Sequence, residues 1–252
     1  LPPRKRMYGG KKMNHANKAI IMAAGIGKRM QPITLHTPKP LVEVNGVRMI
    51  DTVIHGLHQN GIYEIYVVVG YKKEQFESLV TEYPGIVLIH NPHYDKCNNI
   101  SSLYVARDYI ENSIILDGDQ IIYNDNILSP EFERSGYNVI WTEQLTKEWL
   151  LTITDGIITH CSRTGGKQGW QLYSISRWNA NDGKKLRKHI ETEFEKKKNY
   201  QIYWDDVAIF CYPQEYSLGI RQMQPGDLIE VDGIEELISL DPSYLKFIKG
   251  EL

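Results

Sequence analysis

Four short apolar runs constrain the fold of the first half of this chain. Between each run and the next lies a segment whose apolar residues have helical spacing. The clearest helical spacing covers residues 47–60, which end before Gly61. Strand and helix that alternate over about 120 residues predict a parallel sheet with right-handed crossovers. The four predicted strands are residues 19–22, 62–69, 86–90 and 114–116.

The first of these runs leads into Gly25-Ile26-Gly27, and Lys28, Arg29 and Lys39 follow within the next dozen residues. Glycine lets a backbone approach a ligand closely, and backbone N–H groups together with nearby cations bind anions. The stretch therefore predicts a phosphate-binding loop after a buried strand. An ordinary turn is the alternative, since the P-loop pattern is absent and Met30 stands where the dinucleotide fingerprint needs a third glycine.

Asp117-Gly118-Asp119 follows the fourth predicted strand. The carboxyl ends of parallel strands meet at one edge of a sheet, so these acids are expected beside the glycine loop. Asp119 would suit Mg²⁺, which prefers hard oxygen ligands and few protein carboxylates. A solvated Asp-Gly turn is the competing interpretation.

Composition excludes several classes of protein. The 252 residues carry a formal net charge of −2, which gives no reason to expect nucleic acid as the main partner. No run is long enough to span a bilayer, and no signal-peptide core is present, so no membrane partner is expected. The three cysteines lie far apart, without a metal-binding or disulfide pattern, which favours a cytoplasmic location.

The chain is predicted to form one domain over residues 19–252, preceded by a basic tether or linker remnant over residues 1–18. A basic arm for nucleic acid is the alternative for that segment. Residues 19–135 would form a nucleotide-binding half and residues 136–252 a β-rich acceptor-binding half. In the second half strands are predicted at residues 137–142, 150–154, 157–160 and 171–176, and a charged helix at residues 182–198.

The glycine stretch has a family resemblance. It resembles the signature of the nucleotidyltransferases that make NDP-sugars and CDP-alcohols, at Gly25, Gly27, Arg29, Pro32, Thr34, Pro38, Lys39 and Leu41. Over nearly the whole chain from Lys18 onward, further segments resemble the bacterial CTP:phosphocholine cytidylyltransferases. These segments are NNISSLY at residues 98–104, Glu148-Trp149-Leu150, Tyr203-Trp204-Asp205 and a late acidic pair around Asp232.

The resemblance implies the nucleotide-diphospho-sugar transferase fold. This is an α/β fold with a Rossmann-like, mostly parallel sheet flanked by helices and a smaller β-rich acceptor-binding part. By resemblance, Arg29 holds the leaving pyrophosphate, while Lys39 lies between the α-phosphate and the attacking phosphate. Asp119 and Asp232 would bind Mg²⁺, although Asp232 could instead cap the last helix.

The nucleotide would contact residues of the glycine loop and of the NNISSLY segment. These are Ala23, Ala24, Gly25, Gly27, Asn99, Ser101 and Ser102. Helix capping alone would also explain Asn99 and Ser101.

Aromatic residues beside acids indicate the acceptor. A quaternary ammonium has no N–H to donate, so aromatic faces and nearby carboxylates recognise it. Trp149, Tyr203 and Trp204 would supply faces and Asp205 a charge, with ordinary core packing as the alternative for each aromatic.

These features predict a Mg²⁺-dependent cytidylyltransferase that forms CDP-choline and pyrophosphate from CTP and phosphocholine by direct in-line attack. The same chemistry on 2-aminoethylphosphonate, phosphoethanolamine or a sugar 1-phosphate is the alternative, because a primary ammonium would favour carboxylates over aromatic faces. A non-catalytic nucleotide-binding module is the alternative of another class. A choline kinase domain, fused or neighbouring, is a possible partner.

Overall fold

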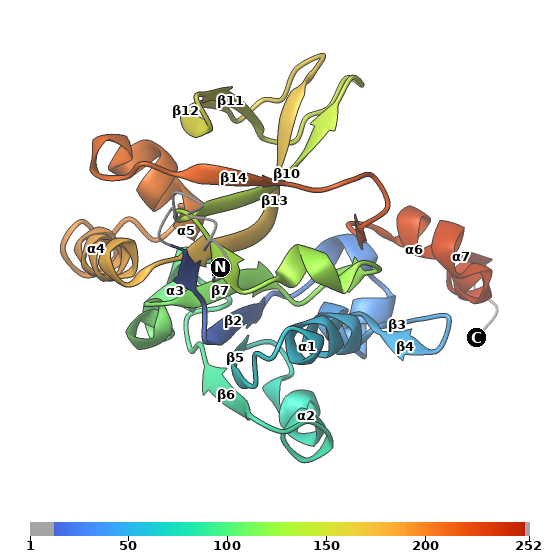
Figure 1. The fold of residues 1–252 in the computed structure, drawn as a ribbon. Coiled ribbons are helices and arrows are strands. Elements are labelled where there is room, and N and C mark those ends of the chain that lie inside the picture. The colour runs from blue at the N-terminus through green and yellow to red at the C-terminus, as the bar shows by residue number, and fades with distance from the viewer. Residues whose placement is uncertain (1–12, 250–252) are drawn as a thin grey trace, which may run out of the picture.

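The computed structural model describes residues 13–249, and one nine-stranded sheet runs through the molecule (Figure 1). The strands lie in the order β10-β14-β12-β11-β13-β7-β2-β5-β6, and β10 also pairs with β13. They are β2 (Lys18–Ala23), β5 (Glu64–Val69), β6 (Ile86–His90), β7 (Ser113–Asp117), β10 (Gly136–Thr142), β11 (Leu150–Thr154), β12 (Ile157–Ser162), β13 (Gly169–Trp178) and β14 (Gly219–Gln222).

The four strands predicted for the first half form a parallel unit, with β5 on one side of β2 and β7 on the other. Successive side chains of β2 point to opposite faces. Ile21 packs on the side covered by α1 and α2, and Ile20 on the side covered by α3 and α4. These helices are α1 (Met49–Gln59), α2 (Glu77–Glu82), α3 (Ile100–Val105) and α4 (Ala180–Glu191).

The second half extends the same sheet. β13 is antiparallel to β7 and continues the sheet, while β10 to β12 and β14 add mainly antiparallel pairs. The predicted α/β class is therefore confirmed. The sheet is mixed and not mostly parallel as predicted, because β10 with β14 is the one parallel pair that the described second half adds to it. The charged helix is shorter than predicted, because α4 ends at Glu191 and the chain continues as a π-helical segment at Thr192–Lys196.

The prediction of a tether over residues 1–18 is wrong for the C-terminal part of that segment. β1 (Asn14–His15) pairs with β9 (Glu131–Phe132), and β2 already begins at Lys18. Backbone pairing with a distant strand and the burial of Ala16 in the core hold this mainly polar segment against the body of the molecule. Residues 1–12, the rest of the predicted tether, lie outside the described residues.

A small second unit covers the glycine loop. β8 (Gln120–Ile122), which the sequence did not predict, pairs antiparallel with β15 (Leu228–Glu230), and α6 (Ile234–Leu240) and α7 (Leu245–Lys249) follow. Met30 of the loop packs in one cluster with Ile121, Val231 and Leu237. A hairpin of β3 (Glu43–Val44) and β4 (Val47–Arg48) lies between the loop and α1. The contacts of Met30 thus pack the C-terminal segment against the glycine loop.

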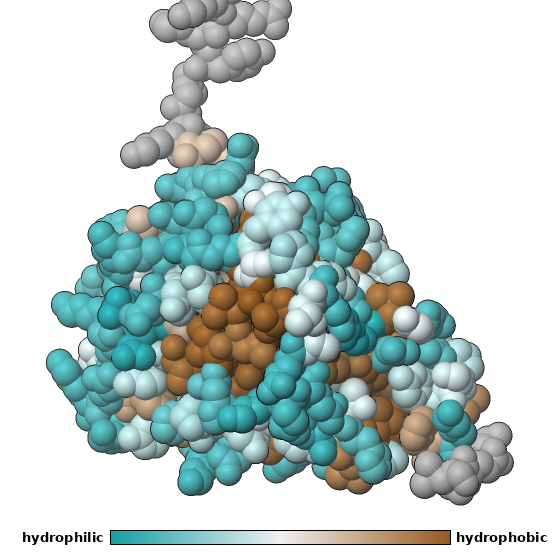
Figure 2. Space-filling model, turned by 90° about the horizontal axis from the view of Figure 1, so that it is seen from below, coloured by the Kyte–Doolittle hydropathy of each residue, from teal (hydrophilic) through white to brown (hydrophobic). Residues whose placement is uncertain are grey.

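Strand β6 forms one edge of the sheet, on the lower side of Figure 1. That side carries hydrophobic surface near its centre (Figure 2), and Val87 of β6 is 47% exposed. Within residues 13–249, no helix combines the length and apolar character that crossing a membrane would require.

Candidate active site

The glycine loop lies at the carboxyl end of β2, where the strand order reverses between β2 and β7. Gly27 has φ +70, and a Cβ there would come within 3.0 Å of Thr34 Cγ2 and 3.2 Å of Lys39 Cβ. Thr34 is fully buried and donates its hydroxyl to the Gly27 carbonyl oxygen at 2.8 Å. Gly27 and Thr34 therefore act together, since their close packing sets the position of Lys39.

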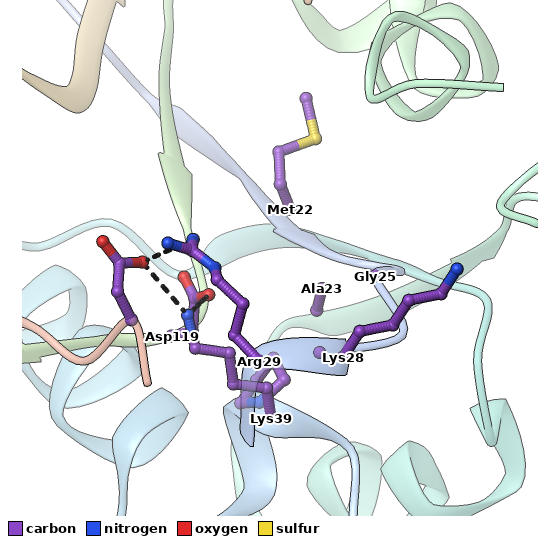
Figure 3. A pocket seen from close by; sticks show the side chains of 10 residues that line it. Met22, Ala23, Gly25, Lys28, Arg29, Lys39 and Asp119 are labelled. Atoms are coloured by element: carbon purple, nitrogen blue, oxygen red, sulfur yellow. Dashed lines mark hydrogen bonds and ion pairs between the residues drawn. The ribbon is translucent and has the colours of Figure 1, made fainter. Parts of the chain in front are cut away.

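Lys39 lies at the centre of a charged cluster. Its Nζ is 2.6 Å from Asp119 Oδ2 and 3.6 Å from Asp232 Oδ1, and Arg29 Nη2 is 3.0 Å from the same Asp232 oxygen. Figure 3 shows Arg29 and Lys39 directed to the same side as Asp119, whereas Lys28 extends the other way. Burial opposes the charge on Lys39, but Asp119, Asp232 and Asp117 outweigh burial, so the pKa of Lys39 lies above its ordinary value.

The pairing of β8 with β15 brings the two aspartates together. Gln120 lies opposite Glu230 in this pair, so Asp119 and Asp232 stand beside each other although they are far apart in sequence. Helix α6 begins instead with Gly233 as its N-cap, and Glu236 Oε2 accepts from the Gly233 N–H at 2.8 Å. The capping alternative for Asp232 is therefore wrong, and its carboxylate belongs to the charged cluster.

A cavity of about 300 Å³ opens on the glycine-loop side of this cluster. Met22, Ala23, Gly25, Gly27 and Lys28 line it, and Arg29, Lys39, Pro40, Asp119 and Asp232 complete it. Ala24, also predicted to contact the nucleotide, is buried, and its carbonyl oxygen accepts from the Tyr71 N–H at 3.1 Å. This cavity has a backbone-rich wall and two cations at one end, the arrangement that a triphosphate requires.

The residues of the NNISSLY segment do not line this cavity. Ser101 and Ser102 are buried, and both hydroxyls accept from Asn91 Nδ2, at 2.9 and 3.1 Å. Asn99 makes no side-chain cap, so the capping alternative is wrong for this residue. Its Oδ1 accepts from the Trp204 N–H at 2.8 Å, which joins α3 to α5 (Trp204–Asp206). A contact of these three residues with a base stays a prediction.

A second cavity, of about 560 Å³, lies on the other side of the cluster and shares Arg29, Lys39, Asp119 and Asp232 with the first. It is rich in acids. Its further lining residues are Asp117, Glu148, Trp149, Leu172, Ser174, Tyr203, Asp205 and Glu230. The two cavities therefore meet where Lys39 stands between the two aspartates.

Burial raises the pKa values of three carboxyl groups in the second cavity. It raises the pKa of Glu230 to about 7, with Asp119 and Asp232 adding repulsion, and the pKa of Asp205 to about 7. The pKa of Asp117 is also raised, first by burial and then by neighbouring carboxylates. Asp117 and Glu230 were not assigned a role from sequence. The signal was present, because each ends a strand two positions before a predicted metal ligand, at the edge where the ligand is expected.

Trp149 and Tyr203 form an aromatic corner in this cavity, with ring centroids 5.9 Å apart at 86°. Arg163 supports Trp149, since its guanidinium lies 5.5 Å from the Trp149 ring centroid and 2.7 Å from Asp206 Oδ1.

The predicted role of Trp204 as a ligand face is wrong. Trp204 is only 2% exposed, and its ring packs 6.2 Å from both Tyr137 and Trp178 in the hydrophobic core. In sequence, a large ring beside an acid predicts that both face the ligand. The turn of α5 directs the acid Asp205 into the cavity and the indole into the core.

The chain is similar to several known proteins. Residues 18–132 match the protein family described as "Nucleotidyl transferase". The chain is 37% identical over 235 residues to a 2-aminoethylphosphonate cytidylyltransferase of Lancefieldella rimae, covering 92% of this chain and 95% of that protein. It is 32% identical to a choline-phosphate cytidylyltransferase of Streptococcus pneumoniae, over 89% of this chain and 96% of that protein.

Among solved structures, the CTP:phosphocholine cytidylyltransferase from Streptococcus pneumoniae superposes with a TM-score of 0.82 at 31% identity. The match covers 90% of this chain and 98% of that one. An inositol-1-phosphate CTP transferase of Thermotoga maritima, 15% identical, shares the fold with a TM-score of 0.74.

Proposed function

This chain belongs to the nucleotidyl transferase family, and we propose that it transfers a cytidylyl group from CTP to a small acceptor that carries a phosphate or phosphonate and an ammonium group. The observation that carries the proposal is the pair of cavities joined at Lys39, Asp119 and Asp232. The first offers backbone and cations to a triphosphate, and the second offers carboxylates and an aromatic corner to an ammonium. The cytidylyltransferase relatives support CTP as the nucleotide.

The chemistry follows from this arrangement. An oxygen of the acceptor phosphate or phosphonate attacks the α-phosphorus of CTP, a new P–O bond forms, and the bond to pyrophosphate breaks. The acceptor oxygen is already ionised near neutral pH, so no side chain needs to remove a proton. Lys39 stabilises charge that develops between the two phosphorus centres, and Arg29 binds the departing pyrophosphate.

Asp119 and Asp232 fit a Mg²⁺ ion. Both carboxylates already converge on one cationic group, since Lys39 Nζ lies 2.6 Å from an Asp119 oxygen and 3.6 Å from an Asp232 oxygen. No group of three or more potential ligands exists among the described residues, and Mg²⁺ often uses only one or two protein carboxylates with substrate phosphates and water. Bound there, the ion would neutralise phosphate charge during transfer.

We rank a primary-ammonium acceptor, 2-aminoethylphosphonate or phosphoethanolamine, above phosphocholine. Glu148, Asp205 and Glu230 supply carboxylates that can accept N–H hydrogen bonds from a primary ammonium, and the burial of Trp204 removes one of three expected aromatic faces. The similarity to a 2-aminoethylphosphonate cytidylyltransferase supports the same order.

Phosphocholine is the second candidate, favoured by the corner of Trp149 and Tyr203. Two aromatic faces at right angles can hold a quaternary ammonium through cation–π attraction. We also propose that the enzyme works in the cytoplasm, a location supported by its three free thiols.

A pyrophosphate-release assay tests both the nucleotide and the acceptor. CTP, UTP, dTTP and ATP are each combined with 2-aminoethylphosphonate, phosphoethanolamine, phosphocholine or glucose 1-phosphate, in the presence of Mg²⁺. We expect CTP with a primary-ammonium acceptor to give the highest kcat/KM. A preference for phosphocholine would reverse the ranking, and a preference for glucose 1-phosphate or the absence of turnover with every pair would refute the proposal.

A further inference from the structure

Arginines in the described part of the chain fall into two groups. Five form ion pairs with carboxylates: Arg29, Arg48, Arg107, Arg163 and Arg187. The other three, Arg134, Arg177 and Arg221, have no carboxylate oxygen of a described residue within 4.0 Å. All three line one cavity of about 400 Å³. Unpaired guanidinium groups are thus concentrated in one place.

Arg177 is the most deeply placed of the three, at 3% exposure. Its guanidinium donates to the Ser129 and Ile127 carbonyl oxygens at 2.8 and 2.6 Å and to Asn138 Oδ1 at 2.7 Å. These acceptors are neutral, so they orient the group without balancing its charge. Burial, and after it the positive charge of Arg221, lowers the pKa of Arg177. A buried cation without a counter-charge is costly, and an anion in the cavity would offset that cost.

The other two arginines reach the cavity from the solvent side, and both also bond only to neutral oxygens. Arg134 Nη1 donates to Ser217 Oγ at 3.0 Å, and Arg221 Nη2 donates to the Glu131 carbonyl oxygen. Arg134 is held in place by packing, because a Cβ on Gly219 would come within 2.6 Å of its Cδ. Glu131 and Glu133 also line the cavity, and both residues are exposed. Burial lowers the pKa of Arg221 and the charge of Glu131 opposes this effect, so Glu131 balances part of the charge on Arg221.

The cavity is separate from the active site. It shares no lining residue with the two active-site cavities. Strands β10 and β7 are both antiparallel to β13 and so run in the same direction. Gly136, at the start of β10, lines the arginine cavity, whereas Asp117, at the end of β7, lines the acceptor cavity. The two sites therefore lie at opposite ends of the strands.

We propose that Arg134, Arg177 and Arg221 form a second anion site, which binds a small phosphate-bearing ligand. Guanidinium forks match phosphate oxygens in pairs, and a phosphate or pyrophosphate group carries enough negative charge to balance more than one of them. A single carboxylate has only two oxygens, fewer than the three guanidinium groups could engage together. The site goes beyond the proposed transferase activity and does not depend on it.

Isothermal titration of the full chain with pyrophosphate, without Mg²⁺, tests the site. Every protein carries Lys39→Ala, which weakens binding at the active site. We expect pyrophosphate to bind this protein at one site. Adding Arg134→Ala and Arg221→Ala should weaken that binding by about tenfold or more, the loss expected for charged hydrogen bonds. Arg177 is left unchanged because its three bonds support the fold.

The matched control adds Arg107→Ala and Arg187→Ala, one half-buried and one exposed arginine that pair with Glu191 and Asp108 outside the cavity. It should bind pyrophosphate as tightly as the Lys39→Ala protein. Titrations with inorganic phosphate and with acetate at matched ionic strength separate phosphate recognition from general anion binding. No measurable pyrophosphate binding to the Lys39→Ala protein, equal loss in the control, or equal binding of acetate would overturn the proposal.

Discussion

The two cavities of the active site are built in different ways. The cavity on the glycine-loop side is lined by residues 22–40 of one continuous segment, with only Asp119 and Asp232 coming from elsewhere. The acceptor cavity draws side chains from β7, β13, α5, β15 and the chain before β11. The first therefore depends on local backbone geometry and the second on tertiary packing.

The difference extends to charge. The loop side presents Lys28, Arg29 and Lys39, whereas the acceptor side adds Asp117, Glu148, Asp205 and Glu230. Positive charge suits a triphosphate and negative charge suits an ammonium, so under the proposed function this opposition would place the two substrates on opposite sides of Lys39. A nucleotidyl transferase can then change its acceptor through the second cavity and leave the first intact.

The largest effect is expected where the two cavities meet. Asp119→Ala should lower kcat by about 10²–10³-fold, the scale for removing one preorganised electrostatic group at the reacting phosphate. Both the nucleotide and the acceptor should be affected, because Asp119 lines both cavities. Pyrophosphate release with saturating substrates and Mg²⁺ measures the change.

Asp108→Ala is the matched control, since Asp108 is an exposed aspartate that pairs with Arg187 away from both cavities. It should keep wild-type turnover. Near-normal activity of Asp119→Ala would remove this residue as a metal ligand.

A smaller, one-sided effect is expected for the aromatic corner. Trp149→Ala should raise the acceptor KM by about 5- to 30-fold, equivalent to ~1–2 kcal/mol of cation–π attraction, and leave the CTP KM unchanged. Trp204→Ala should instead lower the free energy of unfolding by about 3–5 kcal/mol, because Trp204 fills the core.

Steady-state kinetics and urea unfolding together separate the two tryptophans. Trp141→Ala is a control, since Trp141 is 40% exposed and lies outside both active-site cavities. If Trp149→Ala raised both KM values equally, the division between the cavities would be wrong.

The smallest effect concerns pH. Asp205 and Glu230 have pKa values of about 7, so each gains negative charge as the pH rises through 7. The KM for an ammonium acceptor should then fall by about fivefold between pH 6 and pH 8, as expected for ~1 kcal/mol of partly screened attraction. Asp205→Asn should flatten this profile, and an unchanged slope would exclude Asp205 from the cation site.

The contribution of Asp205 to the stability of the folded state should fall as the pH rises, whereas its attraction for an ammonium group should increase. A carboxyl whose pKa is raised by folding stabilises the folded state only while protonated. That contribution of Asp205 is complete below its unfolded pKa near 4 and is lost as the pH rises through about 7. Asp205→Asn should therefore gain stability relative to wild type as the pH increases, which thermal unfolding at several pH values would detect.

The sequence by itself determined the strands and loops whose conformation depends on neighbouring residues in the chain. The apolar run of β2 and the glycines after it required a strand and a tight loop, and the parallel order of the next strands put Asp119 at the same edge. The position of Lys39 was also predictable, because Gly27 and Thr34 that fix it lie within the same segment.

Only the tertiary structure decided the features that depend on contacts between residues far apart in the sequence. β8 is three residues long and pairs with β15 more than a hundred positions away, so no local periodicity could reveal how Asp232 meets Asp119. The same holds for Trp204, since only the packing of α5 against Tyr137 and Trp178 decides which neighbour in Trp204-Asp205 is buried in the core and which faces the cavity. Local sequence sets backbone conformation, whereas the direction of a side chain at a turn is set by the surface it packs against.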